Sequence, residues 1–220
     1  MTRPLVDGRL DMTMMYAIHA ALRRDLAALA VSAAAAGDDP DRLYATHVGW
    51  ELFKRFLTIH HTSEDDSLWP SMRAAVAGRP DDLELLDAME AEHGRIDPLI
   101  KALDEALADR ESGHDRLGDI TDALAHEVTR HLTHEETDAL PLIGRVLPEE
   151  DWVKFGDLQR ARVGMEAAPM YLPWLLDGAP ADRVEGVLKY IPPQLHEPYR
   201  KVWRRSYAEQ NPWSTEHREA

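Results

Sequence analysis

The sequence predicts an all-α protein: an up-down-up-down four-helix bundle followed by a C-terminal helical extension. Three observations support this prediction. Four long segments carry apolar residues at helical spacing, short loops rich in glycine and proline separate them, and the composition changes after Pro141. Long amphipathic helices joined by short loops are typical of antiparallel bundles. We therefore expect residues 1–147 to form the bundle and residues 148–220 the extension.

The first expected helix covers about residues 11–36, where apolar residues and one histidine form a single stripe. It ends at Gly37, because a glycine followed by an Asp-Asp-Pro turn stops a helix. The second expected helix covers about residues 41–63. Its stripe could continue to Leu68, just before Pro70.

The third expected helix covers about residues 81–110 and follows a Gly-Arg-Pro break. Pro98 lies inside it, and the proline ring crowds the carbonyl group of Gly94. We therefore expect a bend there. The fourth expected helix covers about residues 115–140 and again shows a helical apolar stripe.

The expected extension holds over half of the prolines and four of the six tryptophans. It is too apolar for a disordered tail, so we expect it to pack on the bundle as short helices. Their approximate ranges are 149–167, 170–177, 181–190 and 195–209. Residues 211–220 should be frayed.

The composition excludes several classes of protein. A net charge of −15 disfavours binding to nucleic acid and to anionic membranes. The sequence has no apolar run of about 18–20 residues and no signal-peptide pattern, so we expect a cytoplasmic protein. Because cysteine is absent, any metal must bind to imidazole and carboxylate groups, which suit iron, zinc or manganese.

A metal-ligand pattern occurs twice. In each half, a lone histidine is followed by a His-x-x-x-Glu segment with a second acid directly after the glutamate and a proline ten residues after the histidine. The segment from His60 to Pro70 aligns in this way with the segment from His131 to Pro141. The candidate ligands are His19, His60, Glu64, His93, His131 and Glu135.

The spacing fits a pair of metal ions. Residues i and i+4 lie on the same face of a helix, so both members of each His-x-x-x-Glu pair can point into the bundle. A carboxylate can bridge two cations, whereas an imidazole binds one. The two glutamates would therefore span both ions, and the two histidines of each half would bind one ion. The cations would offset the cost of burying two carboxylates.

Other interpretations compete with this one. A single histidine on an apolar face is more often structural, but six such residues in duplicated order rarely arise by accident. His61 with Asp65 forms an alternative register on the second helix. The internal alignment favours His60, because its counterpart His131 is followed by Leu132 rather than by a second histidine.

Several polar residues near these ligands have two interpretations. Glu90 and Glu127 are either surface acids or partners of the metal site, as ligands or hydrogen-bond acceptors for an imidazole. His126 and His134 match the ligand spacing poorly. The remaining histidines are expected on the surface or in loops: His47, His114, His196 and His217.

The doubled pattern over about residues 10–147 resembles the hemerythrin-like, or HHE cation-binding, domain, whose bacterial members show the same ligand order. The resemblance implies two non-haem iron ions with an oxo or hydroxo bridge that react with dioxygen, peroxide or nitric oxide. It assigns the ligands to His19, His60, Glu64, His93, His131 and Glu135.

One position departs from the family's oxygen carriers, which have a second histidine one turn earlier on the third helix. This chain has Met89 there and Met15 at the repeated position. A thioether is a poor ligand for ferric iron, so the site should keep more open positions. Tyr16 could fill one of them, although we favour a core position for its ring. Open positions favour peroxide breakdown or substrate oxidation over simple carriage.

The sequence thus predicts a di-iron protein that binds or reacts with oxygen species. As an enzyme it would be a di-iron oxidoreductase. Two alternatives are an oxidase or oxygenase for a small organic substrate, with the tryptophan-rich extension forming the pocket wall, and an iron sensor or storage module. The expected partners are dioxygen, peroxide or another small molecule, with no nucleic acid and no membrane. The chain would be a monomer or a homodimer.

Overall fold

The computed structural model describes residues 5–6, 9–36, 40–109, 111–210 and 213. Helices form almost all of this part of the chain, as the sequence predicts. Within it, the strands are β1 (Leu5–Val6) and β2 (Arg9–Leu10), two short segments that pair antiparallel before the first helix. The sequence pattern does not predict this pair of strands.

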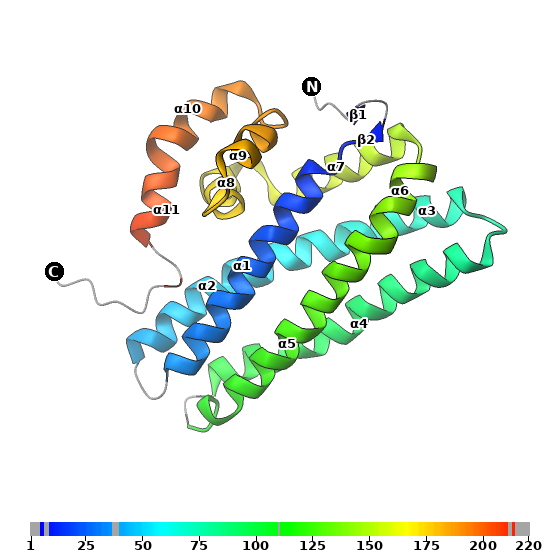
Figure 1. Cartoon of the computed structure of the whole chain (residues 1–220). Coiled ribbons are helices and arrows are strands. Elements are labelled where there is room, and N and C mark those ends of the chain that lie inside the picture. The colour runs from blue at the N-terminus through cyan, green and yellow to red at the C-terminus, as the bar shows by residue number, and fades with distance from the viewer. Residues whose placement is uncertain (1–4, 7–8, 37–39, 110, 211–212, 214–220) are drawn as a thin grey trace.

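Four long helices lie side by side (Figure 1): α1 (Thr13–Ala36), α2 (Pro40–Ser63), α4 (Pro80–Ala108) and α5 (His114–His134). Each packs against two of the others, because α1 contacts α2 and α5 while α4 contacts the same two helices. Their bounds agree with the expected ranges to within a few residues, except where α2 and α5 continue. The four helices therefore enclose a common interior.

Both helices that carry a His-x-x-x-Glu pair continue past the proline that was expected to end them. After α2 the chain passes through a π-helical turn, η1 (Glu64–Leu68), into α3 (Trp69–Ala75). After α5 it passes through η2 (Glu135–Ala139) into α6 (Leu140–Val146). The expected ends at Leu68 and Leu140 are therefore corrected.

The prolines explain the π turns. Pro70 has no N–H group, and its ring would clash with the carbonyl group four residues earlier in a regular α-helix. The turn widens instead, and the Trp69 N–H donates to the Glu64 carbonyl five residues back. Leu140 donates to Glu135 in the same way, just before Pro141. Each π turn thus begins at a candidate ligand.

Two apolar clusters flank the ligands along the bundle. The larger contains residues such as Leu22, Phe53 and Leu103. The smaller contains Met15 and Met89, both almost completely buried, together with residues from η1, α3 and η2. The methionines that replace possible ligands therefore belong to the packed core beside the site.

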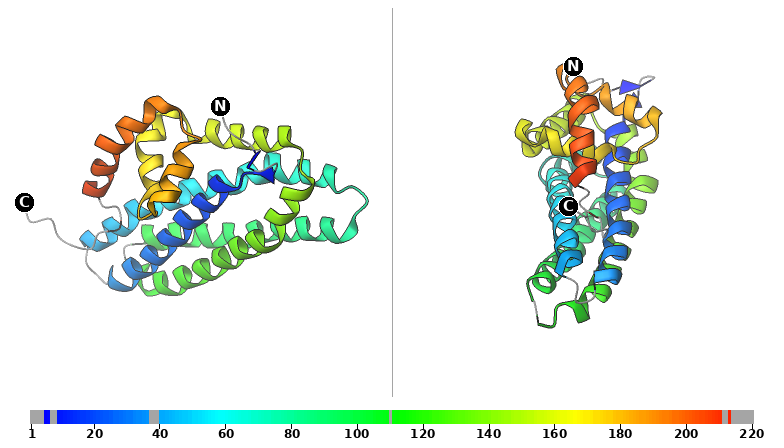
Figure 2. Two further views of the ribbon diagram at one scale, coloured as in Figure 1. Left: turned by 45° about the horizontal axis from the view of Figure 1, so that its top comes forward. Right: turned by 90° about the vertical axis from the view of Figure 1, so that its left-hand side faces the viewer.

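The extension is helical and lies against α1 and α2, on the side away from α4 and α5 (Figures 1 and 2). It comprises α7 (Glu149–Val163), η3 (Met165–Ala167), α8 (Ala168–Leu176), α9 (Ala181–Leu188), η4 (Pro193–Leu195), α10 (His196–Pro198), η5 (Tyr199–Trp203) and α11 (Arg204–Gln210). Helix α7 contacts α2 and η1, while α8 and α9 contact α1. The larger apolar cluster continues into this region through α8, α9, η5 and α11.

Buried polar contacts hold the extension on α1. The Trp174 indole N–H donates to Asp25 Oδ2 at 2.7 Å, and Asp25 is completely buried. Arg24 donates to the backbone carbonyl groups of Trp174 and Asp177 at 2.7 and 3.0 Å. Because an unpaired buried carboxylate is costly, Asp25 and Trp174 specify one seating of α8 on α1.

Three further expectations can be compared with the structure. Helix α4 is continuous through Pro98, and the expected bend stays a prediction. In the expected frayed segment, residues 211, 212 and 214–220 lie outside the described residues, while Trp213 packs against the larger cluster. No helix in the described part of the chain combines the length and the apolar character that a membrane crossing requires.

Candidate metal centre

The structure brings all six candidate ligands into the interior of the four helices. Each of them is at most 4% exposed. One histidine comes from each long helix, and both glutamates are the first residues of the π turns. In chain order they are His19 (α1), His60 (α2), Glu64 (η1), His93 (α4), His131 (α5) and Glu135 (η2).

The histidines pair within each half of the repeat. The Nε2 atoms of His19 and His60 lie 3.1 Å apart, and those of His93 and His131 lie 3.1 Å apart. We call the first pair the α1/α2 half of the site and the second pair the α4/α5 half. This pairing is the arrangement that the duplicated sequence predicts for two ions.

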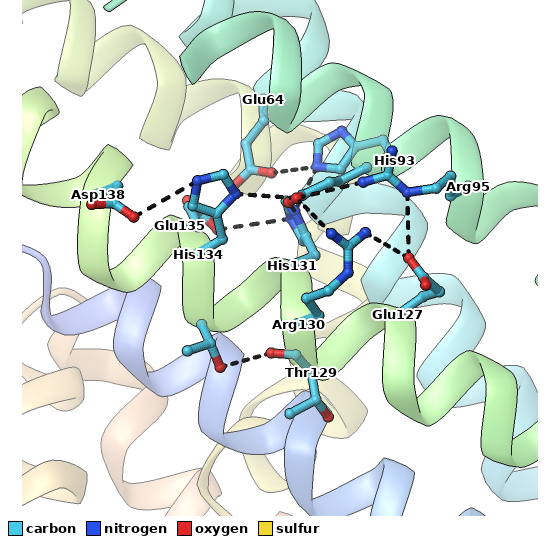
Figure 3. A network of polar contacts seen from close by, with 12 residues as sticks. Glu64, His93, Arg95, Glu127, Thr129, Arg130, His131, His134, Glu135 and Asp138 are labelled. Carbon is cyan, nitrogen blue, oxygen red and sulfur yellow. Dashed lines mark hydrogen bonds and ion pairs between the residues drawn. The ribbon is translucent and has the colours of Figure 1, made fainter. Parts of the chain in front are cut away.

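Each glutamate lies between the two halves. Glu135 Oε2 is 3.1 Å from His19 Nε2 and 4.0 Å from His131 Nε2. Glu64 Oε1 is 3.3 Å from His60 Nδ1, and its Oε2 is 3.5 Å from His93 Nε2. Figure 3 shows both carboxylates directed toward His93 and His131. Each carboxylate can therefore contact cations in both halves.

The second acid of each repeat holds the lone histidine of the other half. Asp65, directly after Glu64, lies 2.8 Å from His93 Nδ1. Glu136, directly after Glu135, lies 2.9 Å from His19 Nδ1 and is itself held by Arg23. A carboxylate at Nδ1 fixes the proton on that nitrogen and leaves Nε2 to bind a metal.

Glu92 performs the same task for His131, which the sequence pattern does not predict. Its Oε2 lies 3.1 Å from His131 Nδ1, and its Oε1 lies 3.1 Å from His134 Nδ1. Nothing in the sequence separates Glu92 from the neighbouring acid Glu90. A residue one position before a ligand points about 100° away from it on the helix, but the sequence does not tell which neighbouring helix that side chain then faces.

The other residues considered as extra ligands lie away from the centre. Glu90 pairs with Arg73, and Glu127 pairs with Arg130, so the interpretation of both as surface acids fits the structure. Tyr16 is 45% exposed, so the favoured core position for its ring is wrong. Of the other histidines, His47, His114 and His126 are exposed, His134 and His196 are half-buried, and His217 lies outside the described residues.

His60 has a neutral partner from the extension. The side-chain amide of Gln159, on α7, lies 3.2 Å from His60 Nδ1. This contact is not predictable from the sequence, because no pattern relates a residue of the extension to one helix of the bundle. The extension therefore reaches the metal centre through one side chain.

A fifth buried histidine joins the site. The ring of His61 is 4% exposed and stacks on His93, with centroids 4.0 Å apart and an interplanar angle of 11°. Its Nε2 atom has no hydrogen bond within the described residues. His60 and His61, which belong to the two alternative registers of the second helix, therefore both lie at the site. Helix α2 lies between α1 and α4, and a rotation of about 100° per residue directs His60 toward α1 and His61 toward α4.

Burial and mutual contacts shift the protonation of the site. Burial, with the charge of Glu135, raises the pKa of Glu64. Burial opposes ionisation of Glu135, but the imidazole of His19 outweighs it and lowers the pKa of this carboxyl. Burial also opposes protonation of His19, yet Glu135 and Glu136 raise its pKa to about 9. Without a cation, Glu64 is therefore driven toward its protonated form, whereas Glu135 stays ionised beside a protonated His19.

The unpartnered atoms show that these residues fit metal ions. Within the described residues, both carboxylate oxygens of Glu64 and both of Glu135 are buried without a hydrogen bond. Leaving such a group unsatisfied costs about 1–3 kcal/mol, and more when it is charged. Three groups of ligand atoms lie within 4.8 Å of one another: His19, His60 and Glu135; His61, His93 and His131; Glu64, His131 and Glu135. Cations would satisfy these carboxylate oxygens, which form no hydrogen bond, and would take the place of the proton between His19 and Glu135.

Comparison with known families agrees with this geometry. The family model of the hemerythrin HHE cation binding domain matches residues 11–143, which include both His-x-x-x-Glu segments. This chain belongs to the hemerythrin HHE family. No curated protein and no solved structure matches it. Membership of this family and the buried His/Glu groups together indicate that the hemerythrin-like chain binds metal.

Proposed function

We propose that this hemerythrin-like protein holds two non-haem iron ions in an up-down-up-down bundle formed by residues 1–147, and that it binds or reacts with dioxygen, peroxide or nitric oxide. One observation carries the proposal. Two completely buried carboxylates lack hydrogen bonds within the described residues, and each lies between imidazoles of both halves. That arrangement suits a pair of cations joined by shared ligands.

The proposed ligands are distributed unequally. His19 and His60 would bind the first ion, whereas His93 and His131 would bind the second with His61 as an added ligand. The two glutamates serve both ions. By this count the first ion has one protein ligand fewer. We therefore expect small exogenous ligands to bind at the α1/α2 half, because catalytic metal sites keep a position open.

The residues that contact Nδ1 of the histidines favour metal binding through Nε2. A histidine that binds metal through Nε2 must carry its proton on Nδ1. The carboxylates beside His19, His93 and His131 accept that proton's hydrogen bond. At His60 the amide nitrogen of Gln159 faces Nδ1 in the structure. If the amide turns over, its carbonyl oxygen can accept the Nδ1 proton of a metal-bound His60.

Iron bound by imidazole and carboxylate supplies redox chemistry toward small oxygen species. The chain supplies a dry interior, since the candidate ligands are at most 4% exposed and apolar clusters lie on both sides. Exclusion of bulk water strengthens the electrostatic interactions of any charged species held there.

Metal analysis of protein from an iron-replete culture tests this proposal. We expect about two irons per chain and a visible absorption band. Glu135→Gln should lose both, because a neutral amide cannot replace a shared carboxylate. Glu127→Gln, eight residues earlier on α5, should retain both because Glu127 pairs with Arg95 and Arg130 rather than with a candidate ligand. Iron-free wild-type protein would refute the proposal.

A second candidate function is an oxidase or oxygenase for a small organic substrate. One observation favours it: an apolar cavity lies between α1 and the extension, beside the residue that contacts His60. Turnover of such a substrate with consumption of dioxygen would support this candidate. An iron-loaded protein that consumes peroxide but no dioxygen in the presence of organic substrates would exclude it.

A further inference from the structure

A cavity of about 170 Å³ lies between the start of α1, helices α7 and α8, and residues 190–195. Its walls are mainly apolar and include Met14, Trp152, Phe155, Leu172 and Ile191. Met165 also lines it and is 65% exposed, which places this side chain at the mouth. A well-formed apolar cavity with few polar groups is the usual form of a small-molecule site.

The charged groups at the cavity already have partners. Asp11 accepts hydrogen bonds from the Thr13 N–H at 2.8 Å and from the Tyr190 hydroxyl. Arg160 forms an ion pair with Asp157 on its own helix. Both charged groups therefore already have partners within the protein, and the rest of the lining offers no counterion to a charged occupant.

Two neutral polar groups remain. Tyr171 lines the cavity, and its hydroxyl forms no hydrogen bond within the described residues. The aromatic ring is fixed by Phe56 and Trp174, with centroids 5.0 and 5.8 Å away. Gln159 also lines the cavity, and its amide contacts His60. These groups suit an occupant with one neutral hydrogen-bonding group.

The cavity adjoins the metal centre. A smaller void of about 10 Å³ is lined by His60 and shares Gln159, Val163 and Tyr171 with the large cavity. These three side chains therefore lie between the large cavity and the void beside His60. His60 belongs to the half of the site with fewer candidate ligands.

We propose that this cavity binds an uncharged, mainly apolar organic molecule of about six to nine non-hydrogen atoms with one hydroxyl or carbonyl group, and that Gln159 couples its occupancy to the metal centre. The size follows from volume, because a cavity of about 150 Å³ accommodates benzene. The coupling rests on the proposed metal centre, whereas the binding site does not.

Calorimetric titration of the full-length, metal-loaded protein tests the ligand class. Phenol should bind at one site per chain, and benzoate, which has a similar ring but a charge, should bind at least about tenfold more weakly. Tyr171→Phe should weaken phenol binding by roughly two- to tenfold, the worth of one hydrogen bond, and leave toluene binding unchanged. Equal affinity for phenol and benzoate would overturn the proposed class.

A cavity-filling variant tests the location. Gly156 lines the cavity on α7, and an added Cβ there meets nothing within 4 Å. Gly156→Leu should therefore weaken phenol binding by about tenfold or more, since pocket methylenes change affinity by roughly 10- to 200-fold. Gly118→Leu is the matched control, because Gly118 is an exposed helical glycine whose Cβ also meets nothing. Both variants should keep wild-type metal content.

A crystal soaked in 4-bromophenol gives a location that needs no variant. The bromine signal should lie among Trp152, Phe155 and Tyr171. A signal only elsewhere, or unchanged phenol binding in a folded Gly156→Leu protein, would overturn the binding site.

The visible absorption of the metal centre tests the coupling. Phenol should shift the band in wild-type protein, and Gln159→Leu should abolish the shift while toluene still binds. A shift that persists in Gln159→Leu would refute Gln159 as the link. A protein that binds phenol but contains no metal would refute the proposed function and the coupling, but not the binding site.

Discussion

The α1/α2 and α4/α5 halves of the metal site share one plan and differ at two points. In both, a lone histidine and a His-x-x-x-Glu pair converge, and the second acid holds the lone histidine of the other half. They differ because His61 has Leu132 as its counterpart. They differ also in the residues at Nδ1: the carboxylate of Glu92 lies there at His131, whereas at His60 the amide of Gln159 lies there beside the central carboxylate of Glu64.

The difference points to a division of roles. A carboxylate at Nδ1 increases the basicity of the imidazole, and an added imidazole raises the ligand number, so we expect the α4/α5 half to hold its ion more tightly. The α1/α2 half has a neutral partner and fewer candidate ligands. It also faces the cavity in the extension. We therefore expect it to be the half that reacts.

The largest loss of metal should come from changing the two glutamates that lie between the halves. Glu64→Gln should remove both ions, as Glu135→Gln should, because each carboxylate contacts a histidine of both halves. Metal analysis should show less than about a tenth of the wild-type iron. Thermal unfolding should then no longer respond to added iron, whereas saturation at about 1,000 times the dissociation constant adds about 4 kcal/mol to wild-type stability. Retention of one ion would mean that the halves bind independently.

Replacing His19 or His93, the lone histidine of each half, should show how much iron each half holds. His19→Ala leaves one histidine in the α1/α2 half, so iron should fall from about two ions to about one per chain. His93→Ala leaves His61 and His131 in the α4/α5 half, so it should keep more iron than His19→Ala at equal iron concentration. Equal losses in the two variants would contradict the role of His61.

Much of this arrangement could be predicted from the sequence, because helical periodicity and a duplicated pattern constrain residues on the same helix face. Helical periodicity places Met15 and Met89 on the apolar stripes of their helices. Their packing together in the smaller cluster, beside the ligands, is seen only in the structure. The positions of Glu92, His61 and Gln159 depend on contacts between helices. Such contacts depend on how each helix is rotated about its axis and on where the extension packs on the bundle. No local sequence pattern specifies either. Pro70 signalled an end to α2, but a π turn accommodated it.

Replacing the carboxylate beside His131 should make the halves more alike. Glu92→Gln leaves a neutral partner at Nδ1, so metal affinity of the α4/α5 half should fall by about 10- to 100-fold, the usual effect of losing such a partner. Competition with a chelator of known affinity measures this. Glu90→Gln is the control two residues earlier, because Glu90 pairs with Arg73 near the surface and should not affect affinity. If both variants lowered the metal affinity equally, the cause would be the loss of one negative charge and not the loss of the contact with His131.

The smallest effect on metal content should come from His61→Leu, which copies Leu132 of the other half. Both ions should remain, with affinity reduced by less than about tenfold, because the α4/α5 half then has the ligand set that already binds an ion in the α1/α2 half. The two iron environments should become more alike, so two Mössbauer doublets should move toward one. His126→Leu, at an exposed position of α5, should leave both doublets unchanged.

The metal-free form of the same variant gives an independent result. The Nε2 atom of His61 is buried without a hydrogen bond among the described residues, and such a group destabilises a fold by about 1–3 kcal/mol. A leucine at this position removes the unsatisfied atom, so metal-free His61→Leu should unfold at a higher denaturant concentration than metal-free wild type. If the variant is instead less stable and keeps two distinct doublets, His61 serves the fold through its stacking on His93 and not the metal.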